Sequence, residues 1–583
     1  MYDNFEICDM PLSLKSNRMR VERFLADSGL RLEDVDYYAA VSDDDGNIIA
    51  GGGLQGNVIK CIAVSEAARE TGLSNRLISH LIRMATQEGA DSVKVYTKPG
   101  NSAIFESMGF KVLASAPHAI LMENGVRGIE RYKNYLRQMR DGRPDGAAAI
   151  VMNANPFTLG HRYLVEQAAQ SATTVYVIVV REDRSTFSYN ERLAMIQAGC
   201  KGLDNVIVVE GSDYAISELT FPTYFLKQVT DATDTHIALD LDLFARHIAS
   251  ELGVTTRMVG SEPVDELTAR YNRLMQEQLP QQGINVQVIE RLTRDSQPVC
   301  ATHVRQALDN GSLSQAAALV PTSTVPYLIA RLATKALRAE LYTTPKPGLV
   351  DRHDNGAHRD MDLALMDKSI DALLPFFAKL AIIGQGNDKV DAGEIRQIGI
   401  DAEKAMLAAT GGVNTHRGAL FAMGLAALAA SWCMAHGNKI DEHSLRDFIM
   451  QVAGQFTPTA GTHGNDAVNA HRVTGALDLA KAGYEQLFNN WLPAYQAYVA
   501  SDAPTARHRL LLLIMSQLDD TNVIHRVGFG QAQQVKREAQ KLLGNFTLEA
   551  MEQMNRDYIA LNISPGGSAD MMALTLFIHS ILN

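Results

Sequence analysis

The alternation of strand-like and helix-like segments between residues 146 and 319, and its loss afterwards, most constrains how this chain folds. Apolar runs such as AAAIVMNA, TVYVIVVRE and NVIVVEGS alternate with segments of helical period, which is typical of a parallel α/β sheet. Ligands of such sheets bind at the carboxyl ends of the strands. We therefore expect a Rossmann-like α/β domain over residues 145–320, with further strands at HIALDLD, TTRMVGSEP and INVQVIERL and a last helix from Thr302.

The segments on either side have different patterns. Before residue 130, YYAAVS, an acidic turn at residues 43–47 and IIAGGGL predict a hairpin, followed by VIKCIAV, a helix over 66–88 and SVKVYT. We expect an α+β domain over 1–130. After the proline-containing stretch 319–327, which predicts a linker or a tight connection, Ala- and Leu-rich helical segments predict an all-α domain over 325–583.

Composition narrows the location and the partners of the chain. A net charge of −12 over 583 residues argues against nucleic acid or an anionic membrane as the main partner and favours small molecules. The five cysteines have neither a metal-binding spacing nor a disulfide framework, which indicates a reducing cytoplasm. The first residues are not a signal peptide, and we expect no apolar run of about 18 residues, so neither secretion nor a membrane span is predicted.

The segment NANPFTLGH, residues 153–161, carries the first candidate site. A strand runs into it and a helix follows. Gly160 lets the backbone approach a nucleotide, and His161 on the first helical turn faces the same phosphate charge as the helix dipole. The alternative for His161 is a structural histidine at a helix start. We predict an ATP-binding turn.

This segment is similar to the HxGH-type motif of the nucleotidyltransferase superfamily, and over its whole length it resembles citrate lyase ligase. Thr158 replaces the first histidine, and SYNER, GSEP and ATHVR follow downstream, with Cys300 and Ala301 where serines are common. The resemblance implies activation of acetate by ATP as acetyl adenylate, then acetyl transfer to the prosthetic-group thiol of the citrate lyase acyl carrier subunit. It implies His161 as the catalytic residue and ATP contacts at Asn153, Asn155, Phe157, Thr158, Gly160, Arg192, Thr302 and Arg305.

The loop RETGLS, residues 69–74, resembles the Q/R-x-x-G-x-G/A loop of GNAT acetyltransferases, whose backbone amides hold the coenzyme A pyrophosphate. Ser74 departs from that pattern. The resemblance implies a GNAT-like fold for residues 1–130, with Arg69 and Gly72 binding the pantetheine-bearing arm of the acceptor. A plain helix N-terminus is the alternative.

In the helical half, acidic residues recur on separate helices together with Lys, His and Arg. Such a set is what a Mg²⁺-triphosphate site requires, because carboxylates bind hard cations and the bases neutralise phosphate. A solvated helix face is the alternative for any one acid. In TTPKPGLVD, the prolines and the glycine break the helix, so we expect a loop that holds Lys346 out between helices.

PKPGLVD, GVNTHRG, DTNV and SPGGSAD together resemble the triphosphoribosyl-dephospho-CoA synthase family, which joins ATP to 3'-dephospho-CoA with loss of adenine. The segment TGALDLA, residues 474–480, departs from the family's Gly-Ala-Arg-Gly-Glu-Ala loop, and we expect it to serve binding only. The resemblance implies Mg²⁺ ligands at Glu340, Asp351, Glu403, Asp519 and Asp520, ligand contacts at Lys346, Asn414, His416 and Arg417, and a catalytic base among Asp351, Asp520 and Asp570.

Three functions follow from these patterns. The first is a bifunctional enzyme of citrate lyase maturation, whose helical half makes the prosthetic-group precursor and whose other parts acetylate the finished group. The second is a GNAT acetyltransferase that uses acetyl-CoA and has accessory nucleotide-binding domains. The third is a non-catalytic scaffold for the carrier protein. Release of pyrophosphate from ATP and acetate separates the first from the other two.

Overall fold

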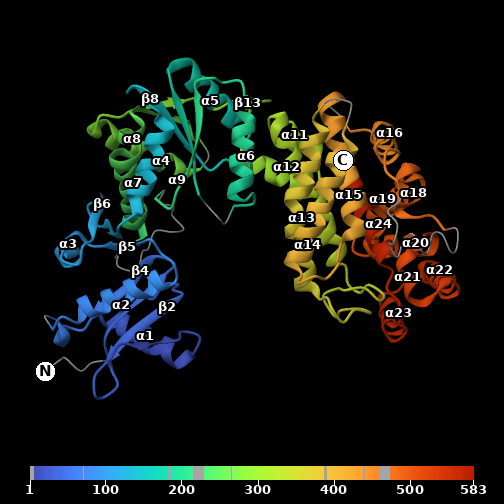
Figure 1. Cartoon of the computed structure of the whole chain (residues 1–583), viewed down its shortest axis with the longest axis horizontal. Helices are drawn as coiled ribbons and strands as arrows, with labels where there is room; N and C mark the ends of the chain where they lie inside the picture. Colours follow the sequence, from blue (N-terminus) through green and yellow to red (C-terminus); the bar gives the residue numbers. More distant parts are fainter. Residues whose placement is uncertain are drawn as a thin grey trace. The chain divides into compact units, whose positions relative to one another are not determined.

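The computed structural model describes residues 6–69, 71–181, 185–214, 229–263, 265–386, 390–437, 440–457 and 473–583, without the side chains of 229–231. These residues form two compact units (Figure 1). The first unit holds Met1–Asn155 and Gly160–Pro298, and the second holds Pro156–Leu159 and Val299–Asn583. Residues 299–319 therefore pack with the helical part, although we expected them to close the α/β domain. The division into three domains remains a prediction.

The N-terminal part of the first unit contains a seven-stranded sheet of order β1-β2-β3-β4-β5-β7-β6. The predicted hairpin is confirmed, and its turn is held by the Asp43 carboxylate, which accepts the backbone N–H of Asn47 at 2.7 Å. β4 and β5 are parallel and pair only at Val58↔Lys94 and Ile59↔Val95. The elements are β1 (Cys8–Asp9), α1 (Lys15–Asp27), β2 (Tyr37–Ser42), β3 (Ile48–Gln55), β4 (Val58–Val64), η1 (Glu66–Ala68), α2 (Leu73–Gln87), β5 (Ser92–Thr97), η2 (Pro99–Asn101), α3 (Ser102–Glu106), β6 (Lys111–Ser115), β7 (Ile120–Gly125) and α4 (Gly128–Arg140).

The second part of this unit contains a five-stranded parallel sheet of order β10-β9-β8-β11-β12. The strand order reverses between β8 and β11, which is where α/β sheets bind ligands. In Figure 1, α5 and α6 lie on one side of this sheet, and α4 and α7 lie on the other. The elements are β8 (Ala147–Met152), α5 (Leu159–Ser171), β9 (Val175–Val179), α6 (Tyr189–Gly199), β10 (Val206–Glu210), α7 (Val229–Leu243), the π-helical turn η3 (Phe244–Ala249), α8 (Ser250–Leu252), β11 (Val254–Gly260), α9 (Glu266–Gln278), η4 (Leu279–Gln282), β12 (Asn285–Ile289), β13 (Thr293–Arg294) and β14 (Gln297–Pro298).

The segment HIALDLD was wrongly predicted as a strand, since it belongs to the helix α7. Its apolar side chains Ile237, Leu239 and Leu241 are all buried, although they alternate in the sequence. They are buried because α7 packs against β6, α9 and η3 at once. A helix covered on several sides loses the polar face that would reveal its period.

The second unit is all-helical, as expected, and α12, α13, α15 and α24 pack against one another at its centre. The stretch 319–327 is a tight connection in which the short turn η5 leads directly into α12. The elements are α10 (Ala301–Asp309), α11 (Leu313–Ala317), η5 (Thr322–Thr324), α12 (Val325–Leu341), α13 (Leu363–Gly384), α14 (Ala392–Ala409), α15 (Arg417–Gly437), α16 (Glu442–Ala453), α18 (Ala476–Lys481), η6 (Leu487–Trp491), α19 (Leu492–Asp502), α20 (Ala506–Gln517), α21 (Thr521–Val527), α22 (Phe529–Gly544), α23 (Leu548–Ala560) and α24 (Gly566–Leu582).

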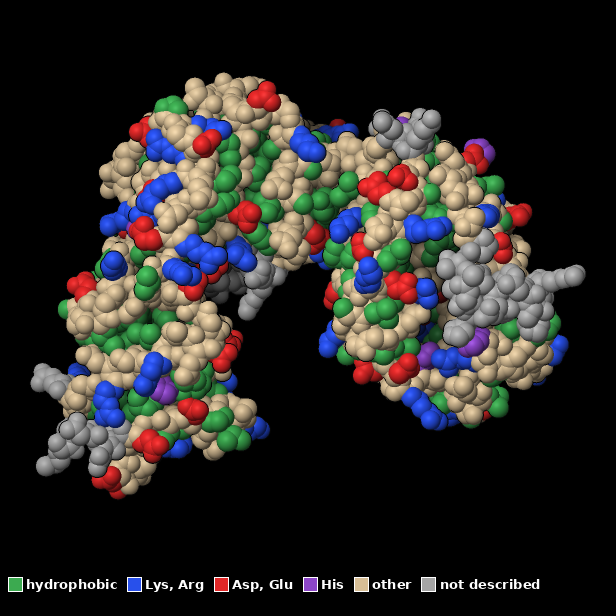
Figure 2. Space-filling model, in the orientation of Figure 1, with side chains coloured by type: hydrophobic (Ala, Val, Ile, Leu, Met, Phe, Trp, Pro, Cys, Tyr) green, Lys and Arg blue, Asp and Glu red, His purple; other side chains and the backbone are tan. Residues whose placement is uncertain are grey.

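The helix α15 corrects the expectation that long apolar runs are missing. By length and composition it would suffice to cross a membrane, and 72% of its most apolar stretch is buried inside the second unit. A helix that is covered by neighbouring helices on several sides is apolar all round, so the burial of α15 in the core explains its apolar composition. On the face shown in Figure 2, Lys and Arg side chains are interspersed with Asp and Glu side chains.

Gly348, in the loop after α12, has a backbone conformation and a close packing that only glycine suits. This residue has a φ of +70°, and a methyl group there would lie 2.1 Å from the carbonyl oxygen of Ile563. Gly348→Ala is expected to lower the free energy of unfolding of the second unit by at least about 2 kcal/mol. Trp432 and Trp491, the chain's two tryptophans, both lie in this unit, so their fluorescence during denaturation reports its unfolding.

The matched control is Gly399→Ala in α14, where an added methyl group meets nothing within 4 Å. Alanine is the better helix former by about 1 kcal/mol, so this variant should be as stable as the parent or slightly more stable. Equal stability of the two alanine variants would contradict the close packing at Gly348.

Candidate active sites

The first candidate site lies where the central strand β8 ends. The predicted ATP-binding turn follows Met152 directly, and α5 begins at Leu159. Ala154 has a φ of +48°, which is uncommon for a residue other than glycine. The Asn155 side-chain oxygen accepts the backbone N–H of Phe187 at 3.0 Å. The turn is therefore held against the segment before α6, at the edge of the sheet where ligands bind.

Arg192 connects three segments around this turn. Its side chain is fully buried and donates hydrogen bonds to the carbonyl oxygens of Asn153 and Val180, both at 2.8 Å, and of Phe187 at 3.1 Å. It lies in the first turn of α6, whose start is fixed by a capping box between Ser188 and Glu191. These contacts give Arg192 a positioning role; its predicted contact with nucleotide remains a prediction.

His161 lies half-buried on α5. Burial and the positive charge of Arg291 lower its pKa to about 4, so the imidazole is neutral at neutral pH. Arg291 forms an ion pair with Glu262, which belongs to the GSEP segment. The sequence did not single out Arg291. His161 on the first turn of α5 and Arg291 after β12 therefore lie close enough for their charges to interact, and their contact with a phosphate remains a prediction.

Four predicted ATP contacts belong to the second unit. Phe157 and Thr158 are buried, and the Phe157 carbonyl oxygen accepts the Thr324 hydroxyl at 3.1 Å. Arg305 donates to the Thr302 hydroxyl at 3.1 Å on the first turns of α10. The combined action of these residues with His161 remains a prediction.

The GNAT-like loop lies at the start of α2. Gly72 has a φ of +80°, and a methyl group there would meet nothing within 4 Å, so its conformation rather than crowding favours glycine. Arg69 is exposed and lies 3.6 Å from Glu66. The first turn of α2 therefore has open space beside it. Coenzyme A-like binding at Arg69 and Gly72 remains a prediction.

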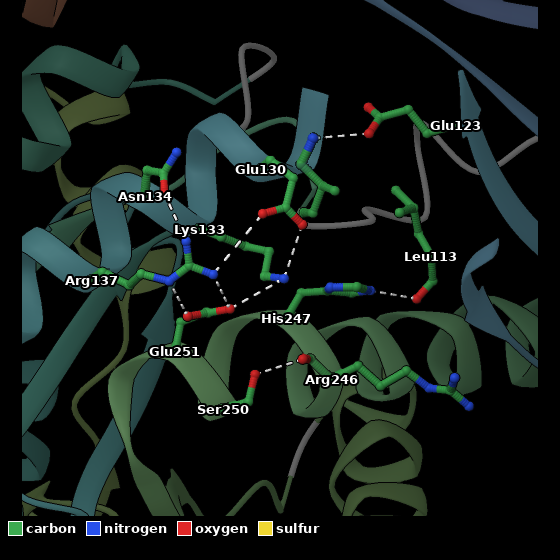
Figure 3. A network of polar contacts seen from close by, with 11 residues as sticks. Leu113, Glu123, Glu130, Lys133, Asn134, Arg137, Arg246, His247, Ser250 and Glu251 are labelled. Atoms are coloured by element: carbon green, nitrogen blue, oxygen red, sulfur yellow. Dashed lines mark hydrogen bonds and ion pairs between the residues drawn. The ribbon is translucent and has the colours of Figure 1, made fainter. Parts of the chain in front are cut away.

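Polar contacts tie the GNAT-like sheet to the α/β part of the same unit (Figure 3). Arg137 on α4 donates to Glu251 on α8 at 2.7 Å, and Lys133 lies 3.2 Å from the same carboxylate. The His247 ring in η3 is hydrogen-bonded to the carbonyl oxygen of Leu113 on β6 at 2.8 Å. The sheet, α4 and the η3–α8 segment are thus cross-linked within the first unit.

The second candidate site is centred on the loop after α12. The predicted exposure of Lys346 is wrong: its side chain is only 1% exposed and pairs with the buried Glu340 at 2.5 Å. The helix is broken as predicted, but the loop folds inward because a buried carboxylate needs a cationic partner. The Asp351 carboxylate accepts the backbone N–H of Lys346 at 2.9 Å and of His353 at 2.7 Å.

Asn555 holds this loop from a distant helix, α23. Its side-chain oxygen accepts the backbone N–H of Gly348 at 2.8 Å, and its amide nitrogen donates to Asp354 at 3.0 Å. The His358 ring is hydrogen-bonded to the Ser564 hydroxyl at 2.8 Å. No motif in the sequence marked Asn555, because it stands among exposed polar residues of an ordinary amphipathic helix.

Asp520 brings two predicted motifs together. One carboxylate oxygen accepts the backbone N–H of Asn522 at 3.0 Å, and the other accepts the N–H of Ser568 at 2.7 Å and its hydroxyl at 3.0 Å. A methyl group at Gly567 would lie 3.0 Å from this carboxylate. The small residues of SPGGSAD are therefore required by the approach of Asp520.

Asp570 lies against the first turn of α15. Its Oδ2 is 2.0 Å from the position that a methyl group on Gly418 would take, and it accepts the backbone N–H of Ala419. Burial and the nearby charges of Asp520 and Glu340 raise the pKa of Asp570 well above its usual range. Three of the predicted acids, Glu340, Asp520 and Asp570, therefore lie near enough for their charges to interact.

Nε2 of His416 and the hydroxyl of Tyr484 are among the buried polar atoms of this unit that have no hydrogen-bond partner among the described residues. The other His416 ring nitrogen is 2.8 Å from the Ser369 hydroxyl, and burial and Lys346 lower the pKa of His416 to about 3. The charge of Asp570 acts on Tyr484, which follows α18 and the altered loop. Unpaired buried groups cost free energy that a polar ligand would offset.

The predicted Mg²⁺ ligands are not gathered into one group. Across the described ranges no cluster of three or more His, Cys, Asp or Glu side chains is arranged to hold a metal ion. Glu403 pairs with Arg417 at 3.2 Å, beside the exposed Asn414, and Asp519 pairs with Lys536 at 2.8 Å. These two acids are thus engaged in partly exposed ion pairs, which is the alternative that the sequence had left open for single acids.

Comparisons with known proteins match three segments of the chain. Residues 23–129 match the acetyltransferase (GNAT) domain, residues 147–328 the citrate lyase ligase C-terminal domain, and residues 326–583 the ATP:dephospho-CoA triphosphoribosyl transferase family. A solved bifunctional NMN adenylyltransferase/ADP ribose pyrophosphatase from Francisella tularensis covers 35% of this chain and 58% of its own, at 17% identity and a TM-score of 0.20.

Two named relatives cover different parts of the chain. A citrate (pro-3S)-lyase ligase of Haemophilus influenzae is 40% identical over 316 residues, which is 53% of this chain and 94% of that protein. A 2-(5''-triphosphoribosyl)-3'-dephosphocoenzyme-A synthase of Pectobacterium atrosepticum is 40% identical over 258 residues, 42% of this chain and 86% of that protein.

Fold and sites define a multidomain enzyme. A GNAT-like sheet comes first and is followed by a parallel α/β sheet with the predicted ATP-binding turn at residues 153–161. The described residues of the second unit are helical and surround a buried polar centre. The chain belongs to the citrate lyase ligase family through its first part and to the triphosphoribosyl-dephospho-CoA synthase family through its second. It therefore combines a ligase with a transferase.

The buried His416 predicts a pH-dependent stability. Its pKa of about 3 in the folded chain lies below the value of about 6.5 in an unfolded one, so the unfolded chain binds the proton more readily. The contribution is therefore fully present above about pH 6.5 and is lost as the pH falls toward 3. His416→Gln should remove roughly 2 kcal/mol of the decline between pH 6.5 and 4.5.

The measurement is denaturant unfolding followed by tryptophan fluorescence at both pH values, for the parent and the variant. The other buried groups are common to both chains, so the difference between the two isolates His416. An identical pH dependence of the two chains would show that His416 is not buried in its neutral form.

Proposed function

We propose that the chain carries out two steps in the maturation of citrate lyase. The first part acetylates the thiol of the prosthetic group on the acyl carrier subunit, and the helical part makes the precursor of that group from ATP and 3'-dephospho-CoA. The observation that carries this proposal is the presence, in one chain, of near-complete counterparts of both named relatives.

In the ligase reaction, a carboxylate oxygen of acetate attacks the α-phosphorus of ATP, pyrophosphate leaves, and acetyl adenylate forms. The acceptor thiol then attacks the acetyl carbon, and AMP leaves as the thiol loses its proton. Negative charge develops on the phosphate oxygens in the first step. His161 at the start of α5 and Arg291, which follows β12, are suited to stabilise it, because donors already in position need no rearrangement.

The GNAT-like sheet then serves to hold the acceptor arm. Its α2 start is open beside Gly72, and the prosthetic group shares its pantetheine arm with coenzyme A. The cross-links from α4 to α8 connect this sheet to the α/β part that binds ATP. This role requires no acetyl-CoA, and it accounts for the GNAT-like part without the competing acetyltransferase function.

In the synthase reaction, a ribose hydroxyl of dephospho-CoA attacks C1' of the ATP ribose, the bond to adenine breaks, and the triphosphate stays on the transferred ribose. The sugar acquires positive charge in the transition state. Glu340, Asp520 and Asp570 are neighbours in the centre of the unit, and carboxylates there stabilise such a charge. The hydroxyl proton passes to an ionised carboxylate that acts as the base, for which Asp351, Asp520 and Asp570 stay the candidates.

Mg²⁺ that accompanies ATP would supply neutralisation of the triphosphate charge when bound. Across the described ranges no three acidic side chains are arranged to hold a metal ion, so the residues present here do not fit a cation held by the protein itself. Lys346 and His416 lie near enough for the charge of one to lower the pKa of the other, and they would face the phosphates.

The test assays both activities on the same chain. ATP and acetate with hydroxylamine as an acceptor should give acetohydroxamate and pyrophosphate, and ATP with 3'-dephospho-CoA should give free adenine. His161→Ala is expected to lower the first rate at least about hundredfold and leave the second unchanged. Asp570→Asn should do the reverse, with a loss of about hundredfold in adenine release.

Acetyl transfer from acetyl-CoA without ATP would overturn the ligase half of this proposal. A parent chain that releases no adenine would overturn the synthase half and would indicate that the altered loop at residues 474–480 has cost the activity. Loss of both activities in either variant would mean that the two sites are not independent.

A further inference from the structure

A small cavity lies in the α/β part of the first unit, beside the carboxyl ends of the parallel strands. It is lined by Val151 near the end of β8, Ile178 near the end of β9 and Arg257 on β11. Val151 stands two residues before Asn153, where the predicted ATP-binding turn begins. The centre of a water-sized group can move over about 20 Å³ there. A single water needs roughly 10–15 Å³, so the space suits a very small ligand.

Arg257 brings a positive charge into this cavity. Its side chain is 4% exposed, and its guanidinium carbon lies 4.3 Å from the centre of the Phe244 ring. Among the described residues, its Nε has no hydrogen-bond partner. A buried N–H group without an acceptor is unfavourable, and an anionic oxygen in the cavity would satisfy it.

Asp240 also lines the cavity and balances part of this charge. It accepts the hydroxyl of Tyr271, which in turn is hydrogen-bonded to Arg257. The charge of Asp240 and the hydrogen bond from Tyr271 explain how the buried guanidinium of Arg257 is tolerated when the cavity holds no anion. Repulsion by the Asp240 carboxylate also restricts a bound anion to an orientation in which its charged oxygens face Nε of Arg257 and point away from Asp240.

The apolar part of the lining is formed by Val151, Ile178, Phe244 and Ile248, and Tyr132, Gly211 and Ser212 complete the lining. Phe244 and Ile248 belong to the π-helical turn η3 between α7 and α8. Such wide turns are rare, and they occur frequently at functional sites. Here the turn supplies two of the apolar side chains that limit the size of the cavity.

We propose that this cavity is the acetate site of the ligase, with Arg257 as the hydrogen-bond donor to the carboxylate and with Phe244 and Ile248 as the residues that limit chain length. The proposal rests on the proposed ligase function. One carboxylate oxygen accepts the Nε–H of Arg257, the methyl group packs against the apolar wall, and the other oxygen attacks the α-phosphorus as described above. The cavity accepts short monocarboxylates and excludes longer ones.

The first test measures the KM for acetate and for ATP in the hydroxamate assay. Arg257→Gln is expected to raise the KM for acetate about tenfold or more, because a hydrogen bond to a charged group is lost, and to leave the KM for ATP within about twofold. The matched control is Arg246→Gln, which removes an exposed guanidinium from the same π-helical turn. This control should leave both constants unchanged.

The second test does not depend on the charge of Arg257. Ile248→Ala enlarges the apolar end, so the ratio of kcat/KM for propionate to that for acetate should rise about tenfold. This variant decides the matter if Arg257→Gln does not fold. A folded, ATP-consuming Ile248→Ala chain with unchanged selectivity, or an Arg257→Gln chain with unchanged acetate KM, would overturn the proposal and leave the cavity to a buried water. A parent chain that forms no acetohydroxamate would instead overturn the ligase function itself.

Discussion

The buried ion pair between Lys346 and Glu340 is the interaction on which the helical unit depends. A charge removed from water is tolerated only with a partner in good geometry, so the end of α12 and the following loop must keep a fixed relation. Asp351 and Asn555 supply that relation by binding the backbone on either side of the lysine. The loop conformation follows from the need to keep one pair of charges together, and the neighbouring acids Asp520 and Asp570 are placed by the starts of α21 and α24.

The requirement that a buried charge has a partner also distinguishes two arginines of the α/β part. Arg192 is buried and donates to three backbone carbonyl oxygens, so its role is to hold strands and helix together. Arg257 is equally buried, yet among the described residues its Nε lacks an acceptor. Buried charges that are satisfied by the protein stabilise the fold, whereas one that is incompletely satisfied indicates a place for a ligand.

The sequence predicts the elements of this fold correctly where a strand or helix is buried on one face, or where a strand is buried along its whole length. β8, β9 and β10 were recognisable because buried parallel strands are nearly continuous apolar runs. HIALDLD was wrongly predicted as a strand, because the helix α7 to which it belongs is covered on several sides and so shows no helical period in its apolar residues. The motif acids Asp520 and Asp570 do meet, as expected, since their motifs lie at helix starts. Asn555 and Arg291 were not predictable, because each acts across a long stretch of chain on a partner that no local pattern identifies.

The position of α15 has a consequence for how the chain is made. This apolar helix packs against α12, α13 and α24, and α24 is the last helix of the unit to be synthesised. While residues 438–583 are still being translated, one side of a helix that is apolar enough for a membrane lacks its cover. Premature association of that surface competes with folding until α24 docks. When α24 docks, it covers this side of α15 and brings Asp570 against Gly418 on the first turn of α15.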